Sequence, residues 1–192
     1  MSIQKTIITI IKEILQTALI SLGIFFFVYI FLVQPHRIKG ESMNPNFADG
    51  ELILTEKVSY YIYKPQRGDV VVFKAPKTTR VDFIKRIIGL PGENVKIEDG
   101  TVFINGQKLI EPYETQKTQG GMSITLLENQ YFVLGDNREA SSDSRSFGPI
   151  ERNTIKGKAW LVYWPITRSG RSQGLRIISS INYGIPDMFY DR

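Results

Sequence analysis

The sequence predicts a mainly β fold, with one antiparallel β domain joined to a single N-terminal transmembrane helix. Residues 14–33 form an uncharged apolar run, and the chain beyond them alternates short apolar segments with turn-forming pairs such as Asp99-Gly100. No helix-period pattern of comparable length follows the apolar run. A chain of 192 residues is long enough for one domain with a real core and little more.

The first expected element is the apolar run ILQTALISLGIFFFVYIFLV. At 1.5 Å per residue, about 20 residues cross the ~30 Å hydrocarbon core of a bilayer. Gln34-Pro35-His36-Arg37 follows in place of a small-residue cleavage site, so we predict a retained anchor. A buried core helix is the alternative. The predicted organisation is an N-terminal segment at 1–13, an anchor at 14–33, a β domain at 34–166 and a tail of unknown role at 167–192.

The remaining elements are short strands bounded by turns. The expected strands are 52–54, 70–73, 95–98, 101–104, 130–134 and 159–164. Asp99-Gly100 predicts a hairpin between two of them. The aromatic run from Trp160 to Trp164 fits either a core strand or a lipid interface. A short helix is expected to start at Leu175.

Composition excludes several classes of function. The chain has no cysteine, which rules out disulfides, thiol nucleophiles and zinc–thiolate sites. The net charge of +5 is spread along the chain, so we expect no nucleic-acid partner. Lysine and arginine are nearly balanced around the apolar run, so charge alone leaves its orientation open.

Three residues outside the anchor carry possible chemistry: a serine, the single histidine and a lysine. A serine such as Ser42, in Gly40-Glu41-Ser42-Met43-Asn44-Pro45, needs a nearby base to act as a nucleophile. His36 is the only histidine, and we interpret it as an interfacial polar residue, although a triad through it is conceivable. A serine before a turn is otherwise an ordinary turn residue.

Lys85 is the alternative base, because it lies in the apolar segment Phe83-Ile84-Lys85-Arg86-Ile87-Ile88-Gly89-Leu90-Pro91-Gly92. On a strand its neighbours at alternate positions are apolar, and burial among them lowers the pKa of a lysine. Arg86 falls on the opposite face, where we expect it to meet Asp82. A lysine that reaches solvent from a strand edge is the bland alternative.

A third segment is the polar loop Gly135-Asp136-Asn137-Arg138, which runs on to Ser141, Asp143, Ser144 and Arg145. By itself it fits an Asx-turn. Together, however, the three segments resemble the type I signal peptidase (leader peptidase) family, in its compact branch without a large inserted domain. The resemblance spans most of the chain from about Phe31 to Pro165.

The resemblance implies a membrane-bound serine endopeptidase with a Ser/Lys dyad. Ser42 matches the family's nucleophile and Lys85 its general base, and Ser141 matches the hydroxyl that hydrogen-bonds and orients the lysine. Asp143 and Arg145 resemble a supporting ion pair, and Asp136 and Arg138 resemble further support for the loop. At Gly40, another branch carries a serine whose hydroxyl helps bind the oxyanion, so this chain must hold that charge in another way.

The resemblance also implies the substrate and the location. Preprotein signal peptides are the expected substrates, cut after small residues in an Ala-x-Ala pattern, as fits an extended peptide on a β edge. Ile38, Met43, Phe47 and Ile84 are the candidate pocket walls. No metal or cofactor is expected. The N-terminus is expected in the cytoplasm, with the bilayer as partner and the catalytic domain outside.

Two competing functions follow from the same residues. A self-cleaving repressor also uses serine and lysine, but it would need a DNA-binding helical domain where this chain has an apolar run. A membrane-tethered β module that binds envelope components without catalysis is the alternative from another class.

Overall fold

The structure is a computed structural model of the chain that describes residues 3–76, 81–112 and 116–178. The chain divides into two compact units, one up to Gln34 and one from Pro35. We describe each unit by itself.

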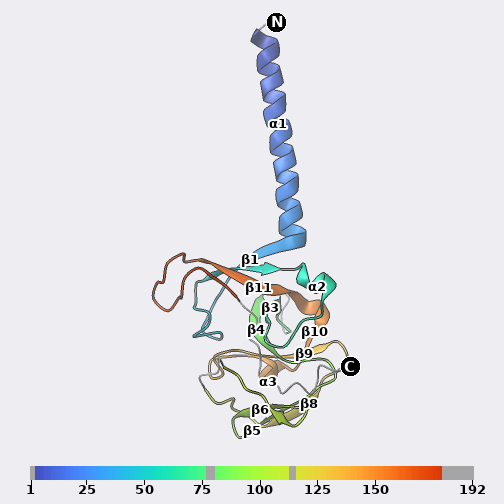
Figure 1. Cartoon of the computed structure of the whole chain (residues 1–192), viewed down its shortest axis with the longest axis vertical. Coiled ribbons are helices and arrows are strands. Elements are labelled where there is room, and N and C mark those ends of the chain that lie inside the picture. Colours follow the sequence, from blue (N-terminus) through green and yellow to red (C-terminus); the bar gives the residue numbers. More distant parts are fainter. Residues whose placement is uncertain (1–2, 77–80, 113–115, 179–192) are drawn as a thin grey trace. The chain divides into compact units, whose positions relative to one another are not determined.

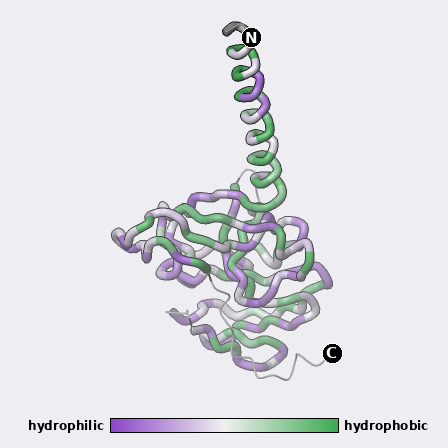
Figure 2. Tube along the Cα trace, turned by 45° about the horizontal axis from the view of Figure 1, so that its top comes forward, coloured by the Kyte–Doolittle hydropathy of each residue, from purple (hydrophilic) through white to green (hydrophobic). Residues whose placement is uncertain are grey.

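The N-terminal unit is one long helix. It comprises α1 (Ile3–Phe27) and a π-helical turn, η1 (Val28–Leu32). Within the described residues, Thr6–Leu32 is the one helix that is long and apolar enough to cross a membrane. An 18-residue window of it has a mean hydropathy of 2.2, and Figure 2 colours much of this helix as hydrophobic. The helix begins before the predicted anchor because lysine and glutamate, which occupy positions 12 and 13, are good helix formers.

The second unit is built on an eight-stranded sheet (Figure 1). Its strands, in spatial order, are β1 (Val33–Arg37), β2 (Leu52–Glu56), β11 (Ile155–Trp164), β3 (Val70–Lys74), β4 (Asp82–Gly89), β9 (Gln130–Leu134) and β10 (Ile150–Glu151), with β12 (Arg176–Ile177) also paired to β11. The pairings from β2 to β10 are antiparallel. The predicted fold class is therefore confirmed.

A smaller antiparallel sheet forms one end of this unit in Figure 1. Its strands, in order, are β7 (Gln107–Lys108), β6 (Thr101–Ile104), β5 (Asn94–Glu98) and β8 (Met122–Thr125). The predicted hairpin is confirmed, because β5 pairs with β6 around Asp99 and Gly100, both at positive φ. The short helices are α2 (Ser59–Ile62), α3 (Ser144–Phe147) and the 3-10 turn η2 (Arg152–Thr154).

Strand β4 lies inside the large sheet, between β3 and β9, and this position sets up the site. Its residues from Lys85 to Gly89 are all buried, so both faces of its second half lie under other parts of the fold. Ile87 packs with Val71 and Val133, whereas Ile88 belongs to the core of the smaller sheet. Two successive side chains on this strand can therefore both be buried, on opposite faces.

The expected helix from Leu175 is wrong. Arg176 and Ile177 form β12, where Ile177 is opposite Leu161 of β11. Isoleucine favours strands, and the edge of β11 offers hydrogen-bonding groups, which the Ile178 N–H uses at 2.8 Å from the Trp160 carbonyl oxygen. The rest of the tail, residues 179–192, lies outside the described residues. Trp160 and Trp164 lie on β11, and both side chains are exposed.

Candidate active site

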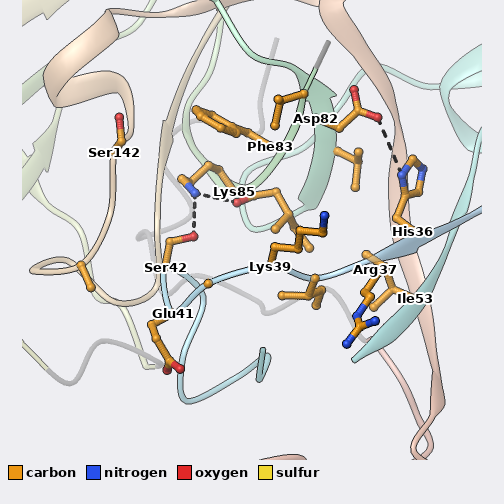
Figure 3. Close-up of a pocket in the computed structure, with 16 residues that line it drawn as sticks. His36, Arg37, Lys39, Glu41, Ser42, Ile53, Asp82, Phe83, Lys85 and Ser142 are labelled. Carbon is orange, nitrogen blue, oxygen red and sulfur yellow. Dashed lines mark hydrogen bonds and ion pairs between the residues drawn. The ribbon is translucent and has the colours of Figure 1, made fainter. Parts of the chain in front are cut away.

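Lys85 reaches Ser42 across the fold. It lies opposite Val71 of β3, and its Nζ donates to Ser42 Oγ at 2.7 Å and to the Ile84 carbonyl oxygen at 2.9 Å (Figure 3). The Phe83 ring centroid is 5.4 Å from the same Nζ. Lys85 is 4% exposed, as the apolar residues around it in the sequence had suggested.

Burial lowers the pKa of Lys85 from 10.5 to about 8, because the ammonium form loses its hydration inside the fold. The carboxylates of Asp143 and Asp136 act in the opposite direction, but their effect on the pKa is smaller. With a pKa of about 8, about a tenth of the amine is neutral at pH 7. An amine with an ordinary pKa would be neutral in well under ~0.1% of molecules.

Ser42 is held in a loop with several backbone hydrogen bonds. The Phe47 N–H donates to the Met43 carbonyl oxygen at 2.8 Å, and the Asn137 N–H donates to the Ser42 carbonyl oxygen at 3.1 Å. A methyl group at Gly135 would overlap this carbonyl oxygen and the Ser141 side chain. Glycine at position 135 therefore lets the polar loop approach the serine closely.

Arg86 does not pair with Asp82, as the sequence had suggested. Its guanidinium makes a two-point contact with Asp136, with Nε and Nη2 at 2.8 and 2.6 Å from the two carboxylate oxygens. Asp136 also accepts from Asn46 Nδ2 at 2.9 Å. Asp82 pairs instead with Lys156, at 2.7 Å. Strand alternation correctly predicted that Arg86 and Lys85 point to opposite faces of β4. The partner of Arg86, however, is Asp136, which follows the end of β9, and not Asp82 on the same strand.

The expected Asp143–Arg145 ion pair is present, with Arg145 Nε 2.8 Å from Asp143 Oδ1. Asp143 also caps α3 by accepting from the Arg145 N–H, and it accepts from the Gly135 N–H at 3.1 Å. Arg145 Nη2 donates to the Arg138 carbonyl oxygen at 2.6 Å. The pair therefore ties both ends of the polar loop together.

Arg138 and Asp136 were expected to support the same loop, and the structure gives them separate partners. Arg138 pairs with Glu111 through both of its terminal nitrogens, and its Nε donates to the Gly135 carbonyl oxygen at 3.0 Å. Glu111 was not a sequence candidate. Its position between β7 and β8 of the smaller sheet gave no periodic or motif signal.

Ser141 does not hydrogen-bond Lys85 in this structure. Its Oγ is buried and has no hydrogen-bond partner within the described residues. The second acceptor for Lys85 Nζ, a role expected for Ser141, is the Ile84 carbonyl oxygen. Ser142, which follows Ser141 in the chain, lines the pocket described below. Sequence reasoning could not find a backbone carbonyl, because every residue carries one.

A pocket of about 520 Å³ opens beside Ser42 and Lys85 (Figure 3). It is lined by residues 36–42, Ile53, Val72, residues 81–85, Ala140 and Ser142. Of the four expected wall residues, Ile38 and Ile84 line it. Met43 and Phe47 are not among the described lining residues; they are buried in a core cluster with Ile53 and Val70.

His36 lies in the pocket wall but not beside the serine. Its Nδ1 is 3.9 Å from Asp82 Oδ2, and no hydrogen bond joins it to Ser42 among the described side chains. Burial lowers the pKa of His36 below its ordinary value, against the opposing effect of Asp82. A triad through His36 is therefore disfavoured. In the described ranges, no three His, Cys, Asp or Glu side chains gather where they could hold a metal ion.

Residues 166–178, which we call the C-terminal strap, contact the loop that carries the serine. Arg176 places both terminal nitrogens on the buried Glu51 carboxylate at 2.8 Å, and Nη2 also donates to the Asn46 carbonyl oxygen at 2.6 Å. Ser172 Oγ donates to the same carboxylate. Asn46 is thus held from two sides, by the strap and by Asp136.

Comparison with known proteins gives consistent matches. The model of the family described as signal peptidase, peptidase S26, matches residues 11–164. Signal peptidase IB of Staphylococcus aureus (strain COL) is 38% identical over 178 residues, which cover 81% of this chain and 92% of the relative. The probable signal peptidase I-1 of Synechocystis is 34% identical over 169 residues, covering 84% and 86%. A crystal structure of a signal peptidase I from Enterococcus faecalis V583 has 36% identity and a TM-score of 0.46, covering 50% of this chain and 97% of that one.

Proposed function

This chain belongs to the signal peptidase family, peptidase S26, and from that premise we propose that Ser42 is its nucleophile and Lys85 its general base. Membership identifies a membrane-anchored serine peptidase that removes signal peptides from preproteins. The single observation that carries the proposal is the 2.7 Å contact between Lys85 Nζ and Ser42 Oγ.

The proposed reaction starts from the neutral amine of Lys85. Its lone pair takes the proton of the Ser42 hydroxyl while Oγ attacks the carbonyl carbon of the scissile bond. The new ammonium then donates the proton to the leaving amine, which gives an acyl-enzyme. Lys85, neutral again, takes a proton from water, and the resulting hydroxide attacks the acyl carbonyl carbon. The ester bond to Ser42 Oγ then breaks, the Lys85 ammonium returns its proton to Oγ, and the signal peptide leaves with a free carboxyl terminus.

Backbone groups are the proposed oxyanion donors. Gly40 has no side chain to offer, and the hydrogen bonds of the described residues leave the Ser42 N–H without an acceptor. A donor already fixed in the folded state stabilises developing charge without reorganisation. We assign the Ser42 N–H to the tetrahedral oxygen.

Substrate preference and orientation complete the proposal. Ile38 and Ile84 are two apolar lining residues beside the reacting pair, and they favour small side chains in an Ala-x-Ala pattern. Alternate residues of an extended peptide point to the same side, so the first and third residues before the bond face one wall. We further propose that the N-terminus lies in the cytoplasm, that α1 crosses the bilayer and that the catalytic domain lies outside.

Cleavage of a preprotein by the full chain in detergent micelles tests this function. Wild type should release one mature product whose N-terminus, read by mass spectrometry, follows a small residue. Ser42→Ala should give no product while its circular dichroism spectrum stays that of wild type. Product from Ser42→Ala at the wild-type rate would refute the nucleophile. A wild type without activity would favour the non-catalytic β module.

A further inference from the structure

The C-terminal strap, drawn as the orange-to-red loop after β11 in Figure 1, has hydrogen bonds of its own. The Leu175 N–H donates to the Ile166 carbonyl oxygen at 3.1 Å, and Ser169 and Ser172 exchange backbone hydrogen bonds of 2.9 and 3.3 Å. These bonds give the C-terminal strap a defined shape. It contacts the loop of residues 40–51, which we call the serine loop, and the proposed reaction assigns it no role.

The contact with the serine loop centres on Arg176. Its two terminal nitrogens are each 2.8 Å from the buried Glu51 carboxylate, and Nη2 is also 2.6 Å from the Asn46 carbonyl oxygen. Its guanidinium carbon lies 5.5 Å from the centroid of the Phe47 ring. Glu51 in turn accepts from the Ala48 N–H at 3.2 Å. The ion pair therefore holds three successive residues of the serine loop.

The same three residues are connected to the nucleophile. The Phe47 N–H donates to the Met43 carbonyl oxygen at 2.8 Å, and Met43 directly follows Ser42. The side chains of Met43 and Phe47 belong to one buried cluster, against which Ile178 of the C-terminal strap also packs. A shift of Phe47 would therefore move Met43, and Ser42 with it.

The same three residues are also connected to the strand that carries the base. Asn46 Nδ2 donates to Asp136 Oδ2 at 2.9 Å, and Asp136 receives the guanidinium of Arg86, the neighbour of Lys85 on β4. Asn46 thus lies between Arg176 on one side and the carboxylate that holds β4 on the other.

We infer that Arg176 is a positioning residue for catalysis. It acts through residues 46 and 47 of the serine loop and keeps Ser42 Oγ at its contact distance of 2.7 Å from Lys85 Nζ. A misplacement of about 1 Å between reacting groups can lower a rate by about 100-fold, so such a support affects the chemical step more than substrate binding. This inference rests on the proposed function, because it concerns the proposed reacting pair.

The alternative role of Arg176 is structural only, as the counter-ion of the buried Glu51 carboxylate. The double variant Glu51→Gln/Arg176→Met separates the two roles, because it removes both charges and leaves neither one unpaired in the interior. It also removes the hydrogen bond to the Asn46 carbonyl oxygen and the cation beside Phe47. A counter-ion role predicts the wild-type rate for this variant, whereas a positioning role predicts a slower reaction.

Single-turnover cleavage of a preprotein by the full chain in detergent micelles, with enzyme in excess, tests the inference. At saturating enzyme, the rate constant of the double variant should be about tenfold or more below that of wild type, with an apparent affinity within about twofold. An unfolded fraction of enzyme would not lower this limiting rate constant. Arg168→Met is the matched control, since Arg168 is exposed on the same strap, and it should keep the wild-type rate constant.

Each outcome decides between the roles. A wild-type limiting rate constant in the folded double variant would refute the positioning role, and the proposed function would stand. If wild type itself does not cleave the preprotein, the proposed function fails. Should the double variant not fold, Arg176→Lys provides the second measurement. It keeps a counter-ion for Glu51 but not the planar fork that also reaches Asn46, so the limiting rate constant should fall at least about threefold, and an unchanged value would refute the inference.

Discussion

Lys85 and Arg86 are neighbours on β4, and the fold treats the two buried cations in opposite ways. Their side chains are 4% and 2% exposed. Arg86 makes a two-point ion pair with Asp136. Among the described residues, no carboxylate lies within ion-pair distance of Lys85 Nζ, whose two acceptors are a hydroxyl and a carbonyl oxygen.

The difference shows how one strand can provide both rigidity and reactivity. Alternation sends the two side chains to opposite faces, so one can be paired while the other is left to neutral partners. Pairing keeps the arginine charged, and burial without a pair lowers the pKa of the lysine to about 8. Arg86 thus fixes the loop around Asp136, while Lys85 can exchange a proton.

The largest expected effect is on catalysis by Lys85→Met. Removing the amine should lower kcat by about 10³-fold or more, because the serine loses its general base. Rates of preprotein cleavage measure this, with circular dichroism as the test of folding. Lys74→Met, at an exposed position on β3, is the matched control and should cleave at the wild-type rate. Substantial turnover by Lys85→Met would exclude the lysine as base.

The next effect is on stability, where the two cations should differ in sign. Arg86→Met leaves the buried Asp136 carboxylate without its counter-ion and should lower the free energy of unfolding by about 3–5 kcal/mol. Lys85→Met removes a poorly solvated amine and should raise it at pH 7, by up to about 3 kcal/mol. Chemical denaturation of the full chain in detergent measures both. A change of the same sign in both variants would contradict the comparison.

A pH profile provides a third test. Because the neutral amine is the reactive form, kcat/KM should rise with pH through a midpoint near 8, the pKa of Lys85. Asp143 raises this pKa, so Asp143→Asn should move the midpoint to lower pH. A midpoint near 10, where an ordinary lysine titrates, would show that the amine is not desolvated during turnover.

The smallest effect is expected at an exposed ion pair. Lys96 and Glu98 on β5 are 2.7 Å apart, but their side chains are 44% and 52% exposed. Solvent screens such pairs, so Glu98→Gln should change the free energy of unfolding by less than about 1 kcal/mol. If Glu98→Gln lowered the free energy of unfolding as much as Arg86→Met, the presence of an ion pair, and not its burial, would determine how much stability is lost.

Local patterns predicted six of the strands and one residue of the proposed reacting pair, Lys85. Asp99-Gly100 predicted its hairpin because turn chemistry acts over a few residues. Lys85 was identified because its strand neighbours are apolar, a signal contained within the segment itself. The resemblance to a family added Ser42, which no local pattern distinguishes from a turn serine.

Partners far apart along the chain were not predictable in this way. The choice of Asp136 over Asp82 for Arg86 depends on the register of β4 against β9, which no short segment encodes. Glu111 meets Arg138 through the packing of two loops. Ile38 and Met43 belong to the same buried cluster, but only Ile38 also lines the pocket among the described residues, and this difference depends on the path of the loop.

The C-terminal strap has a practical consequence for anyone who shortens this enzyme. The family match ends at residue 164, yet Arg176 lies beyond it and neutralises a carboxylate in the loop that carries the nucleophile. A version trimmed to the matched region would leave Glu51 sealed in the interior without its cation. The extent of the family match suggests that such a truncation is harmless. The contacts of Arg176 with Glu51 indicate instead that it would destabilise the loop that carries Ser42.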